Sequence, residues 1–147
     1  MAYIHKETFD ITQGIGNGTI PQDFFEIDEL IALPVQVLNR KGYSTISCCS
    51  GHPFGWLLNN PNAEEYEILD MTGEINIIFA EGISLPTSPE LPPRFVIQEI
   101  KTGEQYKISR GFLDVNNAFK TARNILEAME QLYEWTLKLP EYKNKQA

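Results

Sequence analysis

The chain has 147 residues and a mass of 16.7 kDa, which suits one compact domain rather than two. Apolar residues make up 42% and charged residues 22%, the usage of a globular protein rather than of a disordered one. The net charge of -8 argues against general binding to nucleic-acid backbones, and the sequence contains no apolar run long enough to span a bilayer.

The N-terminal part predicts a strand, a turn and a helix. Residues Tyr3–Thr12 mix β-forming and polar side chains and predict the strand, and the glycine-rich run Gly14–Gly18 predicts the turn. Apolar residues then recur at helical spacing over Ile27–Lys41. We expect Pro34 to kink this helix or to begin a second one. The opening residues lack the apolar stretch of a signal peptide, so we expect none.

The middle of the chain predicts two buried strands separated by an irregular segment. Residues Tyr43–Ser47 predict a strand that runs directly into Cys48, and Ser50–Glu65 predict an irregular loop. Residues Glu74–Ala80 carry apolar side chains on both faces, which is typical of a central strand. The proline-rich segment Gly82–Pro93 predicts a stiff connection to the next strand.

The C-terminal part predicts a hairpin and a long helix. Residues Arg94–Ile100 and Gln105–Ser109 flank a K-T-G-E turn signal. Asp114 is the expected N-cap of an amphipathic helix over Val115–Leu139, whose apolar stripe is wide enough to leave room for a homodimer. The tail from residue 140 to 147 is expected to fray.

These elements predict one α+β domain over residues 1–147. A single mixed or mostly antiparallel sheet is expected, covered by an N-terminal helix and the long C-terminal helix. The adjacent cysteines Cys48 and Cys49 have no third cysteine to pair with, which favours a reduced, cytoplasmic protein.

Charge is distributed unevenly along the chain. Residues 42–93 contain seven acids and neither lysine nor arginine, whereas residues 94–123 contain six bases and three acids. One interpretation is a solvated surface on which the signs happen to cluster. The other is a local cationic wall suited to one small anionic ligand.

The segment T-I-S-C-C-S-G-H-P-F-G-W, Thr45–Trp56, concentrates reactive residues where a buried strand ends. In one hypothesis Cys49 is a catalytic nucleophile activated by His52. In a second the same two residues bind zinc, but the chain offers few further ligands, so we expect no metal site. In a third the Cys48–Trp56 loop binds a ligand together with the nearby basic strands, and in a fourth Cys48 and Cys49 are small buried side chains and His52 caps a turn.

The third and fourth hypotheses stay open, with the catalytic ones behind them. In the third, a small anionic or nucleotide-like molecule is bound without a resident cofactor. Trp56 is expected to stack on a ring of the ligand, and Arg94 or Arg110 to provide bidentate charge-assisted bonds. Hydrogen bonds to the ligand are expected from Ser47, Ser50, the Gly51 backbone and His52, and Cys49 is expected to line the site with Ser50 and Gly51.

The run L-N-R-K-G-Y-S-T-I-S-C-C-S-G-H resembles small uncharacterised proteins of Gram-positive bacteria, their phages and mobile elements. Those proteins show a similar helix, a G-Y-x-T strand and a C-S-G-H loop. They share a later apolar strand, an L-P-P segment, here Leu91–Pro93, and a final helix with the spacing of Leu132–Trp135. The resemblance implies a phage or mobile-element factor and assigns no activity.

Ser47 and Cys49–Gly51 are also similar to the S-x-C-S-G-R signature of the wybutosine-synthesis tRNA methyltransferase family. His52 stands where that family has arginine. The similarity implies an α/β enzyme that uses S-adenosylmethionine to modify RNA. We therefore carry three hypotheses: a ligand-binding protein, an RNA methyltransferase and an oligomeric interaction module built on the final helix.

Overall fold

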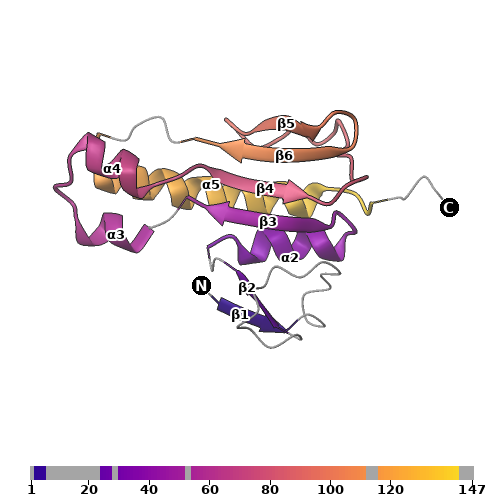
Figure 1. The fold of residues 1–147 in the computed structure, drawn as a ribbon, viewed down its shortest axis with the longest axis horizontal. Helices are drawn as coiled ribbons and strands as arrows, with labels where there is room; N and C mark the ends of the chain where they lie inside the picture. Colours follow the sequence, from indigo (N-terminus) through magenta and orange to yellow (C-terminus); the bar gives the residue numbers. More distant parts are fainter. Residues whose placement is uncertain (1, 6–23, 28–29, 52–53, 112–115, 143–147) are drawn as a thin grey trace.

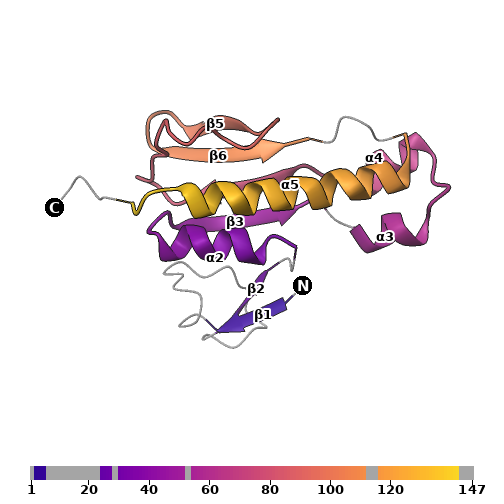
Figure 2. The ribbon, with the colours of Figure 1, turned by 180° about the vertical axis from the view of Figure 1, so that it is seen from behind.

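A computed structural model describes residues 2–5, 24–27, 30–51, 54–111 and 116–142. Its centre is a four-stranded antiparallel sheet in the order β3–β4–β6–β5 (Figure 1). The strands are β3 (Thr45–Ser50), β4 (Ile75–Phe79), β5 (Val96–Lys101) and β6 (Gln105–Arg110). Helices α2 (Ala32–Arg40) and α5 (Ala118–Lys138) lie side by side across one face (Figure 2). The predicted α+β fold with its two covering helices is confirmed.

The strand register assigns each side chain to one face of the sheet. Ile77 of β4 lies opposite Cys48 on one side and Ile108 on the other. Directly opposed residues of antiparallel strands share a face, and the full burial of Ile77 and Ile108 identifies that face as the one beneath the helices. Asn76 and Ile78, which alternate with these residues, therefore belong to the opposite, open face.

Two apolar clusters hold the helices to the rest of the chain. The larger joins the sheet to α2 and to the C-terminal half of α5, with Leu38, Phe79 and Leu132 among its buried members. The smaller lies at the N-terminal end of α5, beyond the sheet, where Leu57 and Ile68 pack against Ile125. Because α5 contributes to both clusters, its position determines how the two ends of the molecule are joined.

The first covering helix begins later than the sequence predicts. Residues Phe24–Ile27 form strand β2, which pairs with β1 (Ala2–His5) in a separate two-stranded sheet. Helix α2 then runs from Ala32 with Pro34 in its first turn, so the predicted helical start at Ile27 is wrong, and of the two predicted roles of Pro34 the structure is nearer to the start of a helix than to a kink. Proline is tolerated there because the first four amide groups of a helix have no intrahelical acceptor. Pro34 thus lies at the start of a single helix.

The segment after β3 is more regular than predicted. Strand β3 continues through both cysteines to Ser50, and two short helices follow, α3 (Phe54–Asn59) and α4 (Glu65–Met71). Helix α4 begins with a capping box in which Glu64 and Glu67 each accept from the other's backbone amide. These helices are too short to be stable alone, and burial of Leu57 and Ile68 beside α5 stabilises them.

The later predictions agree with the structure. Strand β4 is central, β5 and β6 form the expected hairpin, and α5 is the long final helix. Its N-cap is Asn117, whose side chain accepts from the Lys120 amide at 3.0 Å, rather than Asp114, which lies outside the described residues. Residues 6–12 of the predicted first strand and the Gly14–Gly18 turn also lie outside them.

The C-terminal end of α5 is fixed by a lysine from α2's end. The Lys41 ammonium group donates to the carbonyl oxygens of Thr136, Leu137 and Leu139 at 2.9, 2.8 and 2.6 Å. The Leu137 and Leu139 carbonyl groups lie where the intrahelical donors end, and the Thr136 carbonyl also accepts from the Leu139 amide at 3.3 Å. Together these carbonyl groups form the negative end of the helix dipole. All three ammonium hydrogens are therefore used at the one place on α5 where a cation is most favourable.

The chain beyond α5 docks on the same corner, where fraying was expected. The Tyr43 hydroxyl donates to the Pro140 carbonyl at 2.8 Å, and the Tyr142 amide donates to the Lys41 carbonyl at 2.8 Å. The two tyrosine rings are 5.1 Å apart between centroids. Gly42, at a φ of 95°, leaves room for Tyr142, because a Cβ there would approach the tyrosine Cβ to 3.1 Å. Residues 140–142 are thus packed, and 143–147 lie outside the described residues.

Among the helices that the structure describes, none combines the length and apolarity needed to cross a membrane.

We predict that Lys41→Met lowers the free energy of unfolding by about 2 kcal/mol, because it removes three charge-assisted hydrogen bonds and the favourable charge at the end of α5. Urea unfolding followed by circular dichroism measures the loss. Lys120→Met, an exposed change on the same helix, is the control and should remain within about 0.5 kcal/mol of the wild type. Equal values for the two variants would contradict this role of Lys41.

We also predict a loss of stability at alkaline pH that depends on Tyr43. Burial, followed by the charges of Tyr142 and Glu141, raises the pKa of Tyr43 above its ordinary value of 10.0. A raised folded-state pKa means that the stabilisation is complete below about pH 10 and is lost as the pH rises through the folded-state value. Tyr43→Phe should therefore show a shallower decline in urea midpoint between about pH 9 and about pH 11. Parallel declines in both proteins would refute the prediction.

Candidate functional site

The sheet separates the residues that the sequence placed in one binding loop. Cys49 lies opposite Asn76 and Ser47 opposite Ile78, so these two predicted ligand contacts belong to the open face. Cys48 and Ser50 point to the helix-covered face, where Cys48 packs against the larger core cluster. Neither cysteine is in a disulfide. The prediction that the cysteines begin a loop is wrong, because they lie within strand β3.

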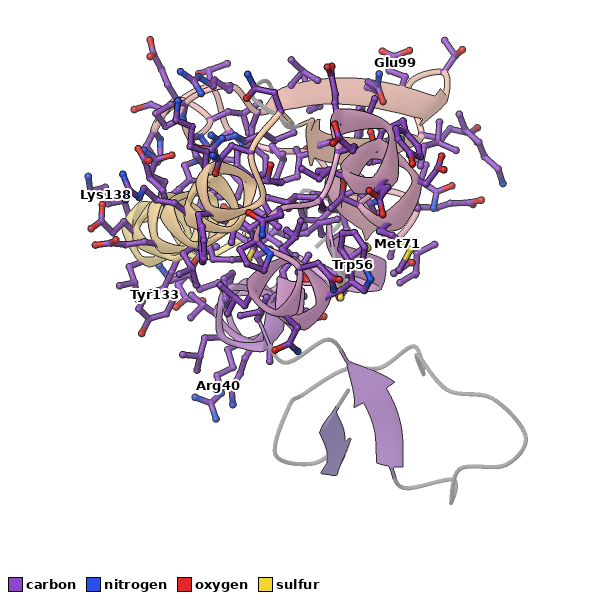
Figure 3. The ribbon with its side chains drawn as sticks, turned by 90° about the vertical axis from the view of Figure 1, so that its left-hand side faces the viewer. Arg40, Trp56, Met71, Glu99, Tyr133 and Lys138 are labelled. Atoms are coloured by element: carbon purple, nitrogen blue, oxygen red, sulfur yellow. The ribbon has the colours of Figure 1, made fainter. Side chains whose placement is uncertain are left out.

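The remaining loop residues are also distributed. Gly51 is buried at a φ of 78°, a conformation that favours glycine, and His52 lies outside the described residues. Trp56 is on α3, where it packs against the smaller apolar cluster. Figure 3 places it on the opposite side of α5 from Lys138. The described part of the Cys48–Trp56 segment therefore spans two faces of the sheet and a helix beyond its edge.

The structure does bring the two predicted arginines together. Arg110 ends β6 on the helix-covered face, opposite Ile75, whose other neighbour across the sheet is Ser50. Two strand spacings, about 10 Å, separate Ser50 from Arg110. Arg94 lies two residues before Val96, which pairs with Ser109, so its backbone lies beside the end of β6 that carries Arg110. Its positive charge is the second cause, after desolvation, that lowers the pKa of Arg110. The basic strands and the end of β3 thus share one end of the sheet.

Arg110 is a buried cation with few partners. Its side chain is 4% exposed, and desolvation is the largest cause that lowers its pKa, followed by Arg94, while Glu127 acts in the opposite direction. Among the described residues it makes one long hydrogen bond, from Nη1 to the Gln131 Oε1 atom at 3.3 Å, and its Nε has no acceptor. A buried donor without an acceptor is unfavourable and requires an explanation.

Arg94 has an unusual backbone conformation. Its φ of 67° lies in the left-handed region, which non-glycine residues rarely adopt and which costs on the order of 1 kcal/mol. Phe95, the next residue, is buried in the core and donates its amide to the Pro92 carbonyl at 3.1 Å. The tight turn before β5 therefore holds an exposed arginine beside Arg110 at the expense of backbone strain.

A pocket of about 520 Å³ opens between this turn and α5. The segment Pro89–Pro93 forms one wall, and the side chains of Gln131, Glu134, Trp135 and Lys138 form the other. Figure 2 shows why there is room: α5 crosses the sheet on the β3 and β4 side, and none of the described helices lies over β5. Leu91 of the proline-rich segment packs against the larger core cluster and thereby positions this wall.

Trp135 is the second buried donor without a partner. Its side chain is 5% exposed, it lines the pocket, and its indole Nε1 has no acceptor among the described atoms. Gln131 lies one helical turn before it and accepts from Arg110, so the pocket wall is connected to the buried cation through one amide. We refer to the pocket lined by the Pro89–Pro93 wall, Gln131 and Trp135 as the Arg110 pocket, after the buried cation that donates to Gln131.

Sequence reasoning identified the arginines of this site and missed its helix side. Gln131 and Trp135 occupy the flank of the amphipathic stripe of α5, where a tryptophan is typical of a core residue. The i, i+4 spacing of an amide and an indole beside a basic hairpin was the only available signal, and it is a weak one. Pro89–Pro93 was predicted as a connection, and the structure adds that it is a pocket wall.

No group of three His, Cys, Asp or Glu side chains suited to a metal ion occurs among the residues described. Comparisons of the chain with protein-family models, with curated proteins and with solved structures found no match in any of the three. The chemistry of the pocket therefore provides the functional argument.

We predict that Arg110→Met raises the free energy of unfolding by about 1–3 kcal/mol, because an aliphatic side chain of similar length replaces a poorly paired buried cation. Lys120→Met, which removes an exposed cation on α5, should change it by less than about 0.5 kcal/mol. Urea unfolding at neutral pH makes the comparison. A loss of stability in Arg110→Met would show instead that Arg110 is retained as a structural contact.

Proposed function

We propose that this protein binds a small molecule through one anionic, acceptor-rich group, with the apolar or flat remainder of the molecule in the Arg110 pocket. One observation carries the proposal: Trp135, which lines the pocket, and Arg110, which donates to Gln131 of the pocket lining, are both at least nine-tenths buried, and each keeps a donor without an acceptor. An anionic oxygen is the group that would satisfy a guanidinium and an indole N–H together. The proposal keeps the predicted ligand class and moves the site away from the Cys48–Trp56 segment.

The size and charge of the pocket narrow the ligand. A volume of about 520 Å³ lies within the range of small-molecule sites, about 300–1,000 Å³. Glu90 and Glu134 lie on its lining together with a single lysine, Lys138. Two carboxylates at the entrance disfavour a polyphosphate by like-charge repulsion. A ligand with one phosphate or one carboxylate, attached to a ring that contacts Leu91 and the prolines, fits these charges better.

The proposed activity is binding rather than catalysis, since the pocket lining offers donors, prolines and carboxylates but no serine or cysteine nucleophile among its described residues. The proposal places the protein in the cytoplasm, because adjacent cysteines that form no disulfide suit a reducing compartment. Binding of S-adenosylmethionine, as implied by the resemblance to the tRNA methyltransferase family, is included as an alternative outcome of the test. A homodimer through the final helix is proposed in addition.

The two tryptophans of the chain provide the test, because each gives a separate indole N–H signal in heteronuclear NMR. Trp135 lines the Arg110 pocket, and Trp56 lies on α3 in the segment that the sequence favoured. Trp135→Phe assigns the signals. Candidate ligands are inorganic phosphate, benzoate, adenosine monophosphate, adenosine triphosphate and S-adenosylmethionine. We expect benzoate or adenosine monophosphate to shift the Trp135 signal saturably and to leave that of Trp56 unchanged.

The matched variants are Arg110→Met and Lys120→Met. Loss of the buried guanidinium should weaken binding by about tenfold or more, the size of one charge-assisted contact, whereas the Lys120 variant should bind as the wild type does. A shift of the Trp56 signal alone would relocate the site to the Cys48–Trp56 segment and contradict the pocket. Absence of any saturable Trp135 shift across the set, or equal affinity in Arg110→Met, would also count against it.

A further inference from the structure

The side of α5 that faces away from the sheet carries a regular seam. Its residues alternate at spacings of four and three along the whole helix: Phe119, Arg123, Leu126, Glu130, Tyr133 and Leu137. We call this set the outer seam. Phe119 is 54% exposed, Leu126 50% and Leu137 52%, although each is a large apolar side chain. Figure 3, which looks along α5, shows Tyr133 pointing outward on the α2 side of the helix.

The outer seam has the spacing of a helix that packs against a second helix. Residues alternating by four and three recur every 3.5 residues on average, the period that keeps a stripe facing a partner helix. Core residues such as Ala122, Ile125 and Leu132 occupy a different side of α5 and are buried in the two apolar clusters. The helix is therefore apolar on a second side that the described structure leaves uncovered. Such a continuous apolar surface is typical of an interaction site.

Charge indicates which partner fits. The outer seam contains one basic residue, Arg123, and one acidic residue, Glu130, both exposed. If a second copy packed with its α5 parallel, the arginines would face each other and so would the glutamates, and like charges in contact destabilise an interface. If it packed antiparallel, Arg123 of each copy would lie within reach of Glu130 on the other copy. The two contacts would lie about one helical turn from the two-fold axis that relates the copies. The seam is complementary to itself in the antiparallel direction alone.

We propose that the protein forms a two-fold symmetric homodimer by antiparallel packing of the outer seams. The seam is nearly palindromic about residue 128: Phe119 and Leu137, Arg123 and Tyr133, and Leu126 and Glu130 are each equidistant from it. The terminal apolar residues therefore meet each other, and each arginine contacts an aromatic ring and a carboxylate. This arrangement is independent of the Arg110 pocket, because Gln131 and Trp135 lie on another side of the helix.

The interface is expected to be small. A pair of 21-residue helices is about 30 Å long, which places the buried area at the low end for specific interfaces. Association should therefore be reversible and visible as a concentration dependence, with a dissociation constant on the order of micromolar. Sedimentation velocity of the full chain from about 1 µM to about 300 µM covers this range.

Charge reversal tests the direction of packing as well as the dimer. Arg123→Glu and Glu130→Arg each place like charges together across the interface and should raise the dissociation constant at least about tenfold. The double variant restores opposite charges and should dimerise as the wild type does. Lys120→Glu makes the same charge change on the same helix outside the seam and should leave assembly unchanged. Circular dichroism verifies that all variants fold.

Three outcomes would overturn the proposal. If the wild type is monomeric at every concentration, the homodimer is excluded and the outer seam would contact a different protein. If neither single charge reversal changes the dissociation constant, the dimer forms through another surface. A double variant that stays monomeric while both single variants are also monomeric excludes the antiparallel pairing of Arg123 with Glu130.

Discussion

The contact between Lys41 and the last carbonyl groups of α5 determines the position of the helix on which the other features depend. Helix dipoles favour a cation at this end, and a lysine with three donors satisfies three carbonyl oxygens at once. Since Lys41 directly follows α2, the contact aligns the ends of the two covering helices. Tyr43 and Tyr142 then close the same corner. The placement of Gln131 and Trp135 beside Arg110 follows from this alignment, because α5 is continuous from its cap to the pocket.

At Arg110, the packing of the side chain and the desolvation of its charge have opposite effects on stability. Ile75, which lies opposite Arg110 on β4, belongs to the apolar core, and an aliphatic side chain at the end of β6 would satisfy the packing without a desolvated charge. The described ion pairs, Lys101 with Glu81 and Lys107 with Glu74, lie on the exposed surface and do not involve Arg110. The adjacent strained backbone at Arg94 adds a second local cost. Two unfavourable features in neighbouring basic residues are explained more simply by a bound anion than by folding.

The parts of the fold that could be predicted are those fixed by local pattern. Apolar residues on both faces identified β4 as central, the K-T-G-E turn identified the hairpin, and long amphipathic spacing identified α5. Short helices α3 and α4 were missed because contacts of Leu57 and Ile68 with α5, rather than local preference, stabilise them. The cysteine segment was misplaced for a related reason: one strand residue more or less exchanges the two faces of the sheet.

The candidate site likewise has one part that the sequence predicts and one part that it does not. Clustering of basic residues is visible in a sequence, so the proximity of Arg94 to Arg110 could be expected. The residues that α5 contributes to the pocket wall could not be predicted. Core, pocket and seam residues of α5 all recur every three or four positions, and they differ only in their angular position around the helix axis. Each residue turns the helix by about 100°, which separates Leu132 of the core, Gln131 of the pocket and Tyr133 of the seam although they are consecutive. Under the two proposals, one helix would complete the core, bind a ligand and contact a second copy, each through a different side.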